Sequence, residues 1–137
     1  MQVTRETDYA IRCILFLSQK LKQNISAAAF SKELKISQAF ISKIIQKLVK
    51  AGLLQSVRGV GGGVQLKKSP GDISLFDIVD AIQGPLGVNI CVVDKKSCDR
   101  SSSCAVHPAW MEIQAMIERK LKSYSIKKLM ERAGRGS

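Results

Sequence analysis

Apolar residues recur every three or four positions in the first stretch of the chain. This series consists of Ala10, Cys13, Ile14, Leu17 and Leu21. Such spacing is typical of the buried face of an α-helix and predicts a helix that begins near Arg5. Because a free cysteine packs like a small hydrophobe, we expect Cys13 to lie in the core.

The next segment predicts two short helices joined by a tight turn. Ser26 is a plausible N-cap for a helix over Ala27–Leu34, and Ser37 is a plausible N-cap for a second helix that ends before Gly52. The expected buried face of the second helix is formed by Ile41, Ile44, Ile45 and Leu48. This arrangement matches a helix-turn-helix.

The opposite face of that second helix is predicted to be exposed. It carries Gln38, Ala39, Phe40, Ser42, Lys43, Gln46 and Lys47. Polar side chains near the start of such a helix, together with Ser37, suit contact with base edges or phosphates. A solvated helix face without a partner is the alternative.

A glycine-rich segment follows the second helix. Leu54–Val57 and residues 64–66 are short β-type stretches on either side of Arg58, Gly59, Val60 and three further glycines, Gly61, Gly62 and Gly63. No Gly-Lys-Ser/Thr sequence follows these glycines, which argues against a nucleotide-binding P-loop. We expect a β-hairpin wing, in which residues 58–61 approach DNA and Arg58 enters a minor groove or holds a phosphate.

The second half of the chain predicts further helices. Ser74 is a plausible N-cap for a helix with an apolar face of Leu75, Ile78, Val79 and Ile82, and Pro108 suits the first turn of a later helix. The later helix carries an apolar stripe of Trp110, Ile113, Ile117, Leu121 and Tyr124, with Met116 beside it. This stripe packs either on its own domain or on a second copy, and we expect a homodimer. A short helix over residues 125–133 would end the fold.

The expected fold class is therefore mainly α with a small β-hairpin wing. It combines a winged helix-turn-helix over residues 1–70 with a second part over residues 71–137. That second part would hold the cysteine-containing loop, residues 91–107, and the dimerisation helices.

Charge separates the two halves of the chain. Residues 1–68 hold 12 Lys/Arg against three acids, a balance of +9, and the remaining 69 residues hold 10 Lys/Arg against eight acids, a balance of +2. A basic first half indicates a polyanion partner, which for this predicted fold is double-stranded DNA. No apolar run approaches the ~18 residues of a membrane span, so a cytoplasmic protein without a membrane partner is expected.

Three cysteines and the single histidine lie close together in the sequence. The spacing is Cys91-x6-Cys98-x5-Cys104-x2-His107. Three thiols and an imidazole suit an iron–sulfur cluster or a zinc ion, although zinc sites commonly pair cysteines two to four residues apart. The same residues are also compatible with a thiol redox switch or with a loop that holds no site. An enzyme acting on a small-molecule substrate is not expected, because no arrangement of catalytic groups stands out elsewhere in the chain.

Several of these segments together resemble the Rrf-type bacterial regulators, the family that contains IscR, NsrR and CymR. The segments are ETDYAIRCILFL, ISQAFISKIIQKL, SVRGVGGGVQL, DIVDAI and the three-cysteine loop followed by HPAW. The likeness covers roughly residues 1–130. Members similar to CymR lack the three cysteines, so the chain looks more like the iron–sulfur branch.

The resemblance implies a homodimeric winged-helix regulator, a repressor of palindromic operators, whose cluster state controls DNA binding. Cys91, Cys98 and Cys104 match the cluster ligands of that branch, although the gap of six residues after Cys91 departs from the five common in IscR-like proteins. His107 matches the fourth ligand of IscR-like proteins, and Asp8 matches that of NsrR-like proteins, where it comes from the partner subunit. The cluster type, [2Fe–2S] or [4Fe–4S], stays open. The alternatives are a small iron–sulfur electron carrier or delivery protein and a regulator with structural zinc.

Overall fold

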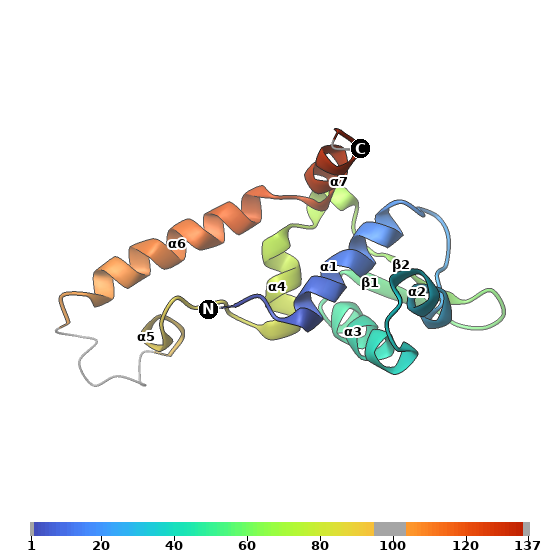
Figure 1. The fold of residues 1–137 in the computed structure, drawn as a ribbon, viewed down its shortest axis with the longest axis horizontal. Coiled ribbons are helices and arrows are strands. Elements are labelled where there is room, and N and C mark those ends of the chain that lie inside the picture. The colour runs from blue at the N-terminus through green and yellow to red at the C-terminus, as the bar shows by residue number, and fades with distance from the viewer. Residues whose placement is uncertain (1, 95–103, 136–137) are drawn as a thin grey trace.

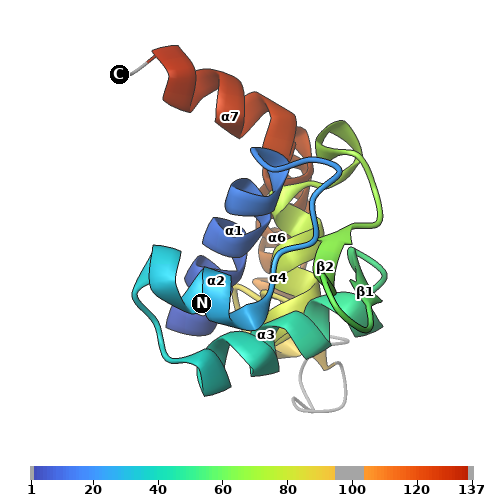
Figure 2. The ribbon, with the colours of Figure 1, turned by 90° about the vertical axis from the view of Figure 1, so that its right-hand side faces the viewer.

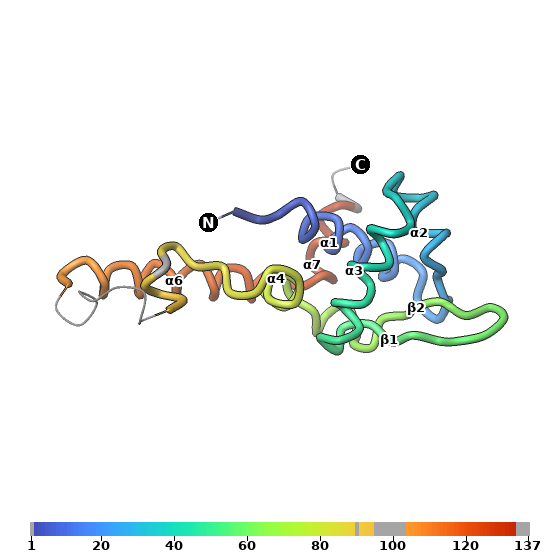
Figure 3. Tube along the Cα trace, turned by 90° about the horizontal axis from the view of Figure 1, so that it is seen from below, coloured from blue at the N-terminus to red at the C-terminus, as the bar shows by residue number. Residues whose placement is uncertain are grey.

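The structure is a computed structural model that describes residues 2–94 and 104–135. Its elements follow in the order α1 (Arg5–Ser18), α2 (Ala27–Leu34), α3 (Gln38–Lys50), β1 (Leu54–Val57), β2 (Gly63–Leu66), the 3-10 turn η1 (Pro70–Asp72), α4 (Leu75–Gln83), α5 (Ile90–Val93), α6 (His107–Ser123) and α7 (Ile126–Arg135). The predicted fold class, mainly α with a small hairpin, is confirmed (Figure 1). The hairpin and α6 lie at opposite ends of the long axis (Figure 3).

Helix α1 begins where the apolar series predicts. The Thr4 hydroxyl accepts a hydrogen bond from the backbone N–H of Thr7 at 3.1 Å and caps the helix. The predicted buried residues Ala10, Cys13, Ile14 and Leu17 are buried. The prediction for Leu21 is wrong, because α1 ends at Ser18 and Leu21, in the turn that follows, is 54% exposed.

Helices α2 and α3 form the predicted helix-turn-helix. The Ser26 and Ser37 hydroxyls cap them. Each accepts a hydrogen bond from the backbone N–H three residues later, Ala29 at 3.1 Å and Phe40 at 3.2 Å. Lys35 takes a left-handed conformation with φ of 57°, which turns the chain sharply between the two helices. The predicted buried face of α3 is confirmed. Figure 2 views this end of the molecule, with α2, α3 and the hairpin gathered around α1.

The hairpin pairs β1 and β2 in antiparallel register, with Leu54 opposite Leu66 and Val57 opposite Gly63. Ile25, in the connection between α1 and α2, forms an isolated antiparallel β-bridge with Val64 of β2. Ile25 donates to the Val64 carbonyl at 3.0 Å, and Val64 donates to the Ile25 carbonyl at 2.9 Å. The wing is thereby joined to the chain just ahead of the helix-turn-helix.

Helix α4 packs on α1 and α3 and carries the chain toward the cysteine segment. Ser74 caps α4 as predicted, through a reciprocal capping box with Asp77. Ile78, Val79 and Ile82 are buried, as expected. Helix α7 joins the same core, because Ile126 is fully buried. The division into parts over residues 1–70 and 71–137 stays a prediction, since residues of both parts contribute to this core.

Helix α6 extends away from the rest of the chain (Figures 1 and 3) and contacts α4 and α5. Pro108 lies in its first turn, as predicted. The predicted apolar stripe is partly covered: Ile113 is 41% exposed, and Met116 beside the stripe is 60% exposed, whereas the other four stripe residues are half-buried. Within α6 the one buried residue is Gln114. None of the described helices combines the length and apolarity that a membrane span requires.

Candidate functional site

The start of α3 presents polar side chains to solvent. Ser37, Gln38, Ala39 and Lys43 are exposed, in agreement with the sequence prediction. The Ser37 hydroxyl is engaged as the helix cap. The remaining side chains are free of the core and lie at the end of α3 that a helix-turn-helix turns toward the major groove.

Three residues of the predicted exposed face, Phe40, Ser42 and Lys47, are only partly exposed, so they are less exposed than predicted. The Phe40 ring packs edge-on against Tyr9 of α1, with centroids 5.8 Å apart. Lys47 lies 2.7 Å from the Glu6 carboxylate, measured between Nζ and Oε1, and this ion pair draws it toward α1. Ser42 is also only partly exposed. Contacts with α1 therefore narrow the surface that α3 offers.

The tip of the wing is exposed, as predicted. Arg58, Gly59, Val60 and Gly61 all lie at the surface, and Val60 is fully exposed. Gly59 and Gly61 have φ of 96° and 76°, left-handed values that other residues adopt with strain. The glycines therefore allow a tight turn that holds Arg58 and Val60 out from the body.

The structure brings together one thiol and the imidazole of the cysteine segment. Cys91 lies in α5, is 8% exposed, and its Sγ is 3.4 Å from Nδ1 of His107, the first residue of α6. Cys91 was expected in a loop, and the short helix α5 corrects that expectation. Cys104 is partly exposed just before α6, and Cys98 lies outside the described residues.

No group of three side chains able to hold a metal ion comes together within residues 2–94 and 104–135. Asp8 lies in the first turn of α1, and its Oδ2 pairs with Arg12 Nε at 3.1 Å. Its side chain is 53% exposed and lies at the surface of the chain. Among the described candidate ligands of this chain, the close contact is the one between Cys91 and His107.

Cys13 stands apart from this site. It is fully buried in the core, and burial raises the pKa of its thiol to about 12. Because metals bind the thiolate, this cysteine is a poor ligand at neutral pH. The core role predicted from its place in the apolar series of α1 is confirmed.

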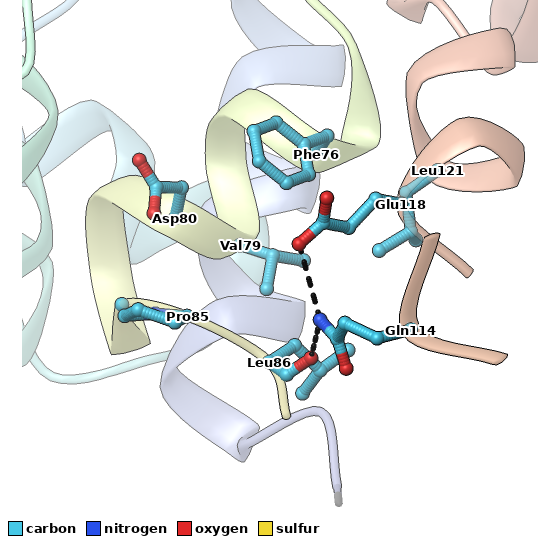
Figure 4. Close-up of a pocket in the computed structure, with 9 residues that line it drawn as sticks. Phe76, Val79, Asp80, Pro85, Leu86, Gln114, Glu118 and Leu121 are labelled. Carbon is cyan, nitrogen blue, oxygen red and sulfur yellow. Dashed lines mark hydrogen bonds between the residues drawn. The ribbon is translucent and has the colours of Figure 1, made fainter. Parts of the chain in front are cut away.

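The segment between α4 and α5 is fastened to α6 by Gln114, a residue that sequence reasoning missed (Figure 4). The Gln114 amide donates to the Leu86 carbonyl at 2.7 Å and to the Glu118 carboxylate at 3.1 Å, and its oxygen accepts from the Val88 N–H at 3.0 Å. The sequence does contain a signal for Gln114. It is a polar residue that keeps the apolar spacing, four residues after Trp110 and three before Ile117. Gln114 thus fixes the chain that leads into Cys91 against the helix that begins at His107.

A second glutamine, Gln83 at the end of α4, fastens the start of α1. Its oxygen accepts from the Thr4 N–H at 3.0 Å and from the Thr7 hydroxyl at 2.8 Å. Its amide nitrogen donates to the Gln2 carbonyl at 2.9 Å. The first turn of α1, which contains Glu6 and Asp8, is therefore linked to the chain that continues into the cysteine segment.

Comparison with known proteins places these features in context. The model of the Rrf2 family, described as iron-dependent transcriptional regulators, matches residues 3–132. The transcriptional regulator NsrR of Geobacillus kaustophilus is 34% identical, in an alignment that covers 96% of this chain and 90% of that protein. Among solved structures, T. potens IscR is 24% identical, with a TM-score of 0.75 over 97% of this chain and 88% of that one. CymR, the global cysteine regulator of B. subtilis, is 21% identical, with a TM-score of 0.76 over 96% of this chain and 98% of that one.

Proposed function

Because the chain belongs to the Rrf2 family of transcriptional regulators, we propose that an iron–sulfur cluster controls how tightly it binds DNA. The family is one of DNA-binding regulators and not of enzymes, which disfavours an electron carrier. We propose Cys91, Cys98 and Cys104 as cluster ligands and His107 or Asp8 as the fourth. The observation that carries this proposal is the approach of Cys91 to His107. A reduced thiol set of this kind suits the cytoplasm.

The distance between Cys91 and His107 fits two ligands of one metal ion. Sulfur at about 2.3 Å and nitrogen at about 2.1 Å from a tetrahedral metal lie about 3.6 Å apart, and the two atoms here are 3.4 Å apart. When four protein ligands hold a cluster, each iron of a [2Fe–2S] cluster has two of them, whereas each iron of a [4Fe–4S] cluster has one. The close pair therefore favours [2Fe–2S] or zinc when His107 is the fourth ligand. With Asp8 of the partner subunit in that place, the Cys91–His107 distance no longer bears on the cluster type, which stays open.

When bound, the cluster would supply a centre that responds to redox agents, nitric oxide or the supply of iron and sulfur. The described residues offer a route from that centre to the rest of the protein. Gln114 joins the segment before Cys91 to α6, and Gln83 joins the end of α4 to the first turn of α1. In that turn Glu6 pairs with Lys47 of α3. A shift of the segment from 84 to 94 would therefore reach both α6 and the helix that reads DNA.

We propose that the protein acts as a homodimeric repressor on a palindromic operator. Ile113 and Met116, the exposed apolar residues along the stripe of α6, would form the dimer contact, and the two α3 helices would enter successive major grooves about 34–36 Å apart. The wings would contact the flanking minor grooves. The proposed DNA contacts are Ser37, Gln38, Ala39, Phe40, Ser42, Lys43, Lys47, Arg58, Gly59, Val60 and Gly61. We expect the exposed residues of this set to make most of the contacts.

The test begins with anaerobic purification, optical and Mössbauer spectra, and metal analysis. A palindromic duplex selected by the protein from random-sequence DNA then serves as the operator. We expect the affinities of cluster-loaded and metal-free protein for this operator to differ by about 5- to 150-fold, the usual range of an allosteric coupling. Equal affinities in both states would contradict cluster sensing, and stoichiometric zinc without visible absorbance would support structural zinc.

Arg58 provides a separate test of the wing. Replacing Arg58 with alanine is expected to weaken operator binding and to lower the slope of log affinity against log salt by about one, because one phosphate contact is lost. Fluorescence anisotropy at several salt concentrations measures both quantities. Lys128→Ala on α7 removes the same charge from another exposed position and should leave the slope unchanged. An unchanged slope in Arg58→Ala would exclude Arg58 as a phosphate contact.

A further inference from the structure

The wing tip, residues 58–62, has little to hold it in place. Its residues Arg58, Gly59, Val60 and Gly61 are exposed, and the chain here is rich in glycine, which has more conformational freedom than any other residue. Gly62 donates to the Gly59 carbonyl at 2.9 Å, which closes the turn but does not attach it to the body. A tip that reads DNA needs a fixed position relative to α3, so an attachment to the body matters.

The chain just before α2 supplies that attachment. Ile25 pairs with Val64 through two backbone hydrogen bonds of 3.0 and 2.9 Å. The two backbones approach so closely that a Cβ on Gly63 would lie 2.5 Å from the Ile25 carbonyl oxygen. Gly63 thus permits the contact, and the residue before Ile25 is brought beside the wing tip.

That residue is Asn24, and both ends of its side-chain amide are used. Its nitrogen donates to the Gly61 carbonyl at 3.0 Å, and its oxygen accepts from the Gln65 amide. Within the part of the chain that the structure describes, no other side chain makes a hydrogen bond to residues 58–62. One amide therefore spans the tip and strand β2.

We propose that Asn24 is a positioning residue for the wing. It fixes the tip to the connection that runs directly into the cap of α2, and so sets where Arg58 lies relative to α3. The proposal rests on the proposed use of the wing in DNA binding. Asn24 itself need not touch DNA, since it acts through the backbone of Gly61.

Two substitutions separate the roles of the two amide ends. Asn24→Ala removes both hydrogen bonds, whereas Asn24→Asp keeps an acceptor for Gln65 but cannot donate to Gly61. Gln23→Ala, at the exposed neighbouring position, is the matched control. We expect both Asn24 variants to lose about three- to tenfold in operator affinity, the range of one lost hydrogen bond, and Gln23→Ala to bind as the parent protein does.

Three further readouts distinguish positioning from a loss of stability. In hydroxyl-radical footprints, the flanking minor grooves should lose protection, while guanine N7 atoms in the central major grooves should stay protected against dimethyl sulfate. In an Arg58→Ala background, Asn24→Ala should cost less than about twofold, because the two changes act on the same contact. Nitrogen-15 relaxation of the free protein should show faster motion of the Gly59, Gly61 and Gly62 amides in both Asn24 variants.

The proposal is overturned by unchanged relaxation at those glycines, by an even loss of protection across the site, or by a full additional loss in the Arg58→Ala background. A protein that binds no duplex in any state, yet shows the expected relaxation change, would contradict DNA binding by the wing and leave Asn24 as its tether. The two failures are therefore distinguishable.

Discussion

Replacing Cys91 with serine is expected to abolish the visible absorbance of the anaerobically purified protein. The operator affinity of this variant should equal that of metal-free protein. It should therefore differ from the affinity of the cluster-loaded protein by about 5- to 150-fold. The reason is that Cys91 is the buried thiol beside His107, and a hydroxyl is a poor ligand for iron in place of a thiolate. Optical titration and fluorescence anisotropy measure the two effects.

Cys13→Ala is the matched control, since it removes a buried thiol that lies in the core away from the site. It should keep the absorbance and the difference between the two states. Circular dichroism of both variants checks that the fold survives. Full absorbance in Cys91→Ser would remove Cys91 from the proposed ligand set.

The same spectra decide between His107 and Asp8. If His107 is the fourth ligand, His107→Ala should shift the absorption bands while Asp8→Asn leaves them unchanged. Loss of the exposed Asp8–Arg12 pair should cost little stability, about 0.5 kcal/mol or less. The reverse pattern would identify Asp8 of the partner subunit as the ligand.

The helices could be predicted from the sequence because their signals are local. Ser26, Ser37 and Ser74 each cap a helix through a residue three positions later, and apolar spacing identified the buried faces. The same local logic failed at Leu21. The apolar spacing continues past Ser18, but the backbone turns there, and spacing alone does not report where a helix ends.

The site was predicted less completely because its contacts join distant parts of the chain. The exposure of Phe40 and Lys47 depends on Tyr9 and Glu6, more than thirty residues earlier in the sequence. Gln83, Gln114 and Asn24 bind backbone carbonyls or N–H groups, which every residue has. Such partners leave no pattern in the sequence, so only the fold identifies what these three side chains bind, even though the polar position of Gln114 within an apolar spacing marks that residue.

Replacing Met116 with lysine is expected to convert the protein from a dimer to a monomer. Met116 is 60% exposed in the single chain and lies three residues from Ile113, which is 41% exposed, on a helix that extends away from the body. In the proposed dimer this stripe would be buried, and an ammonium group without a partner there would carry a large desolvation cost. Analytical ultracentrifugation measures the change.

Operator affinity should fall with the dimer. A monomer contacts one half-site, and loss of the second, tethered contact typically lowers affinity by about 100- to 10,000-fold. Ala133→Lys adds the same charge at an exposed position on α7 and should remain a dimer with unchanged affinity. Because Met116 lies far along the chain from α3 and the wing, a Met116→Lys monomer that keeps its fold but loses the operator would link dimerisation through α6 to DNA reading. A variant that remains dimeric would instead place the dimer contact on another surface.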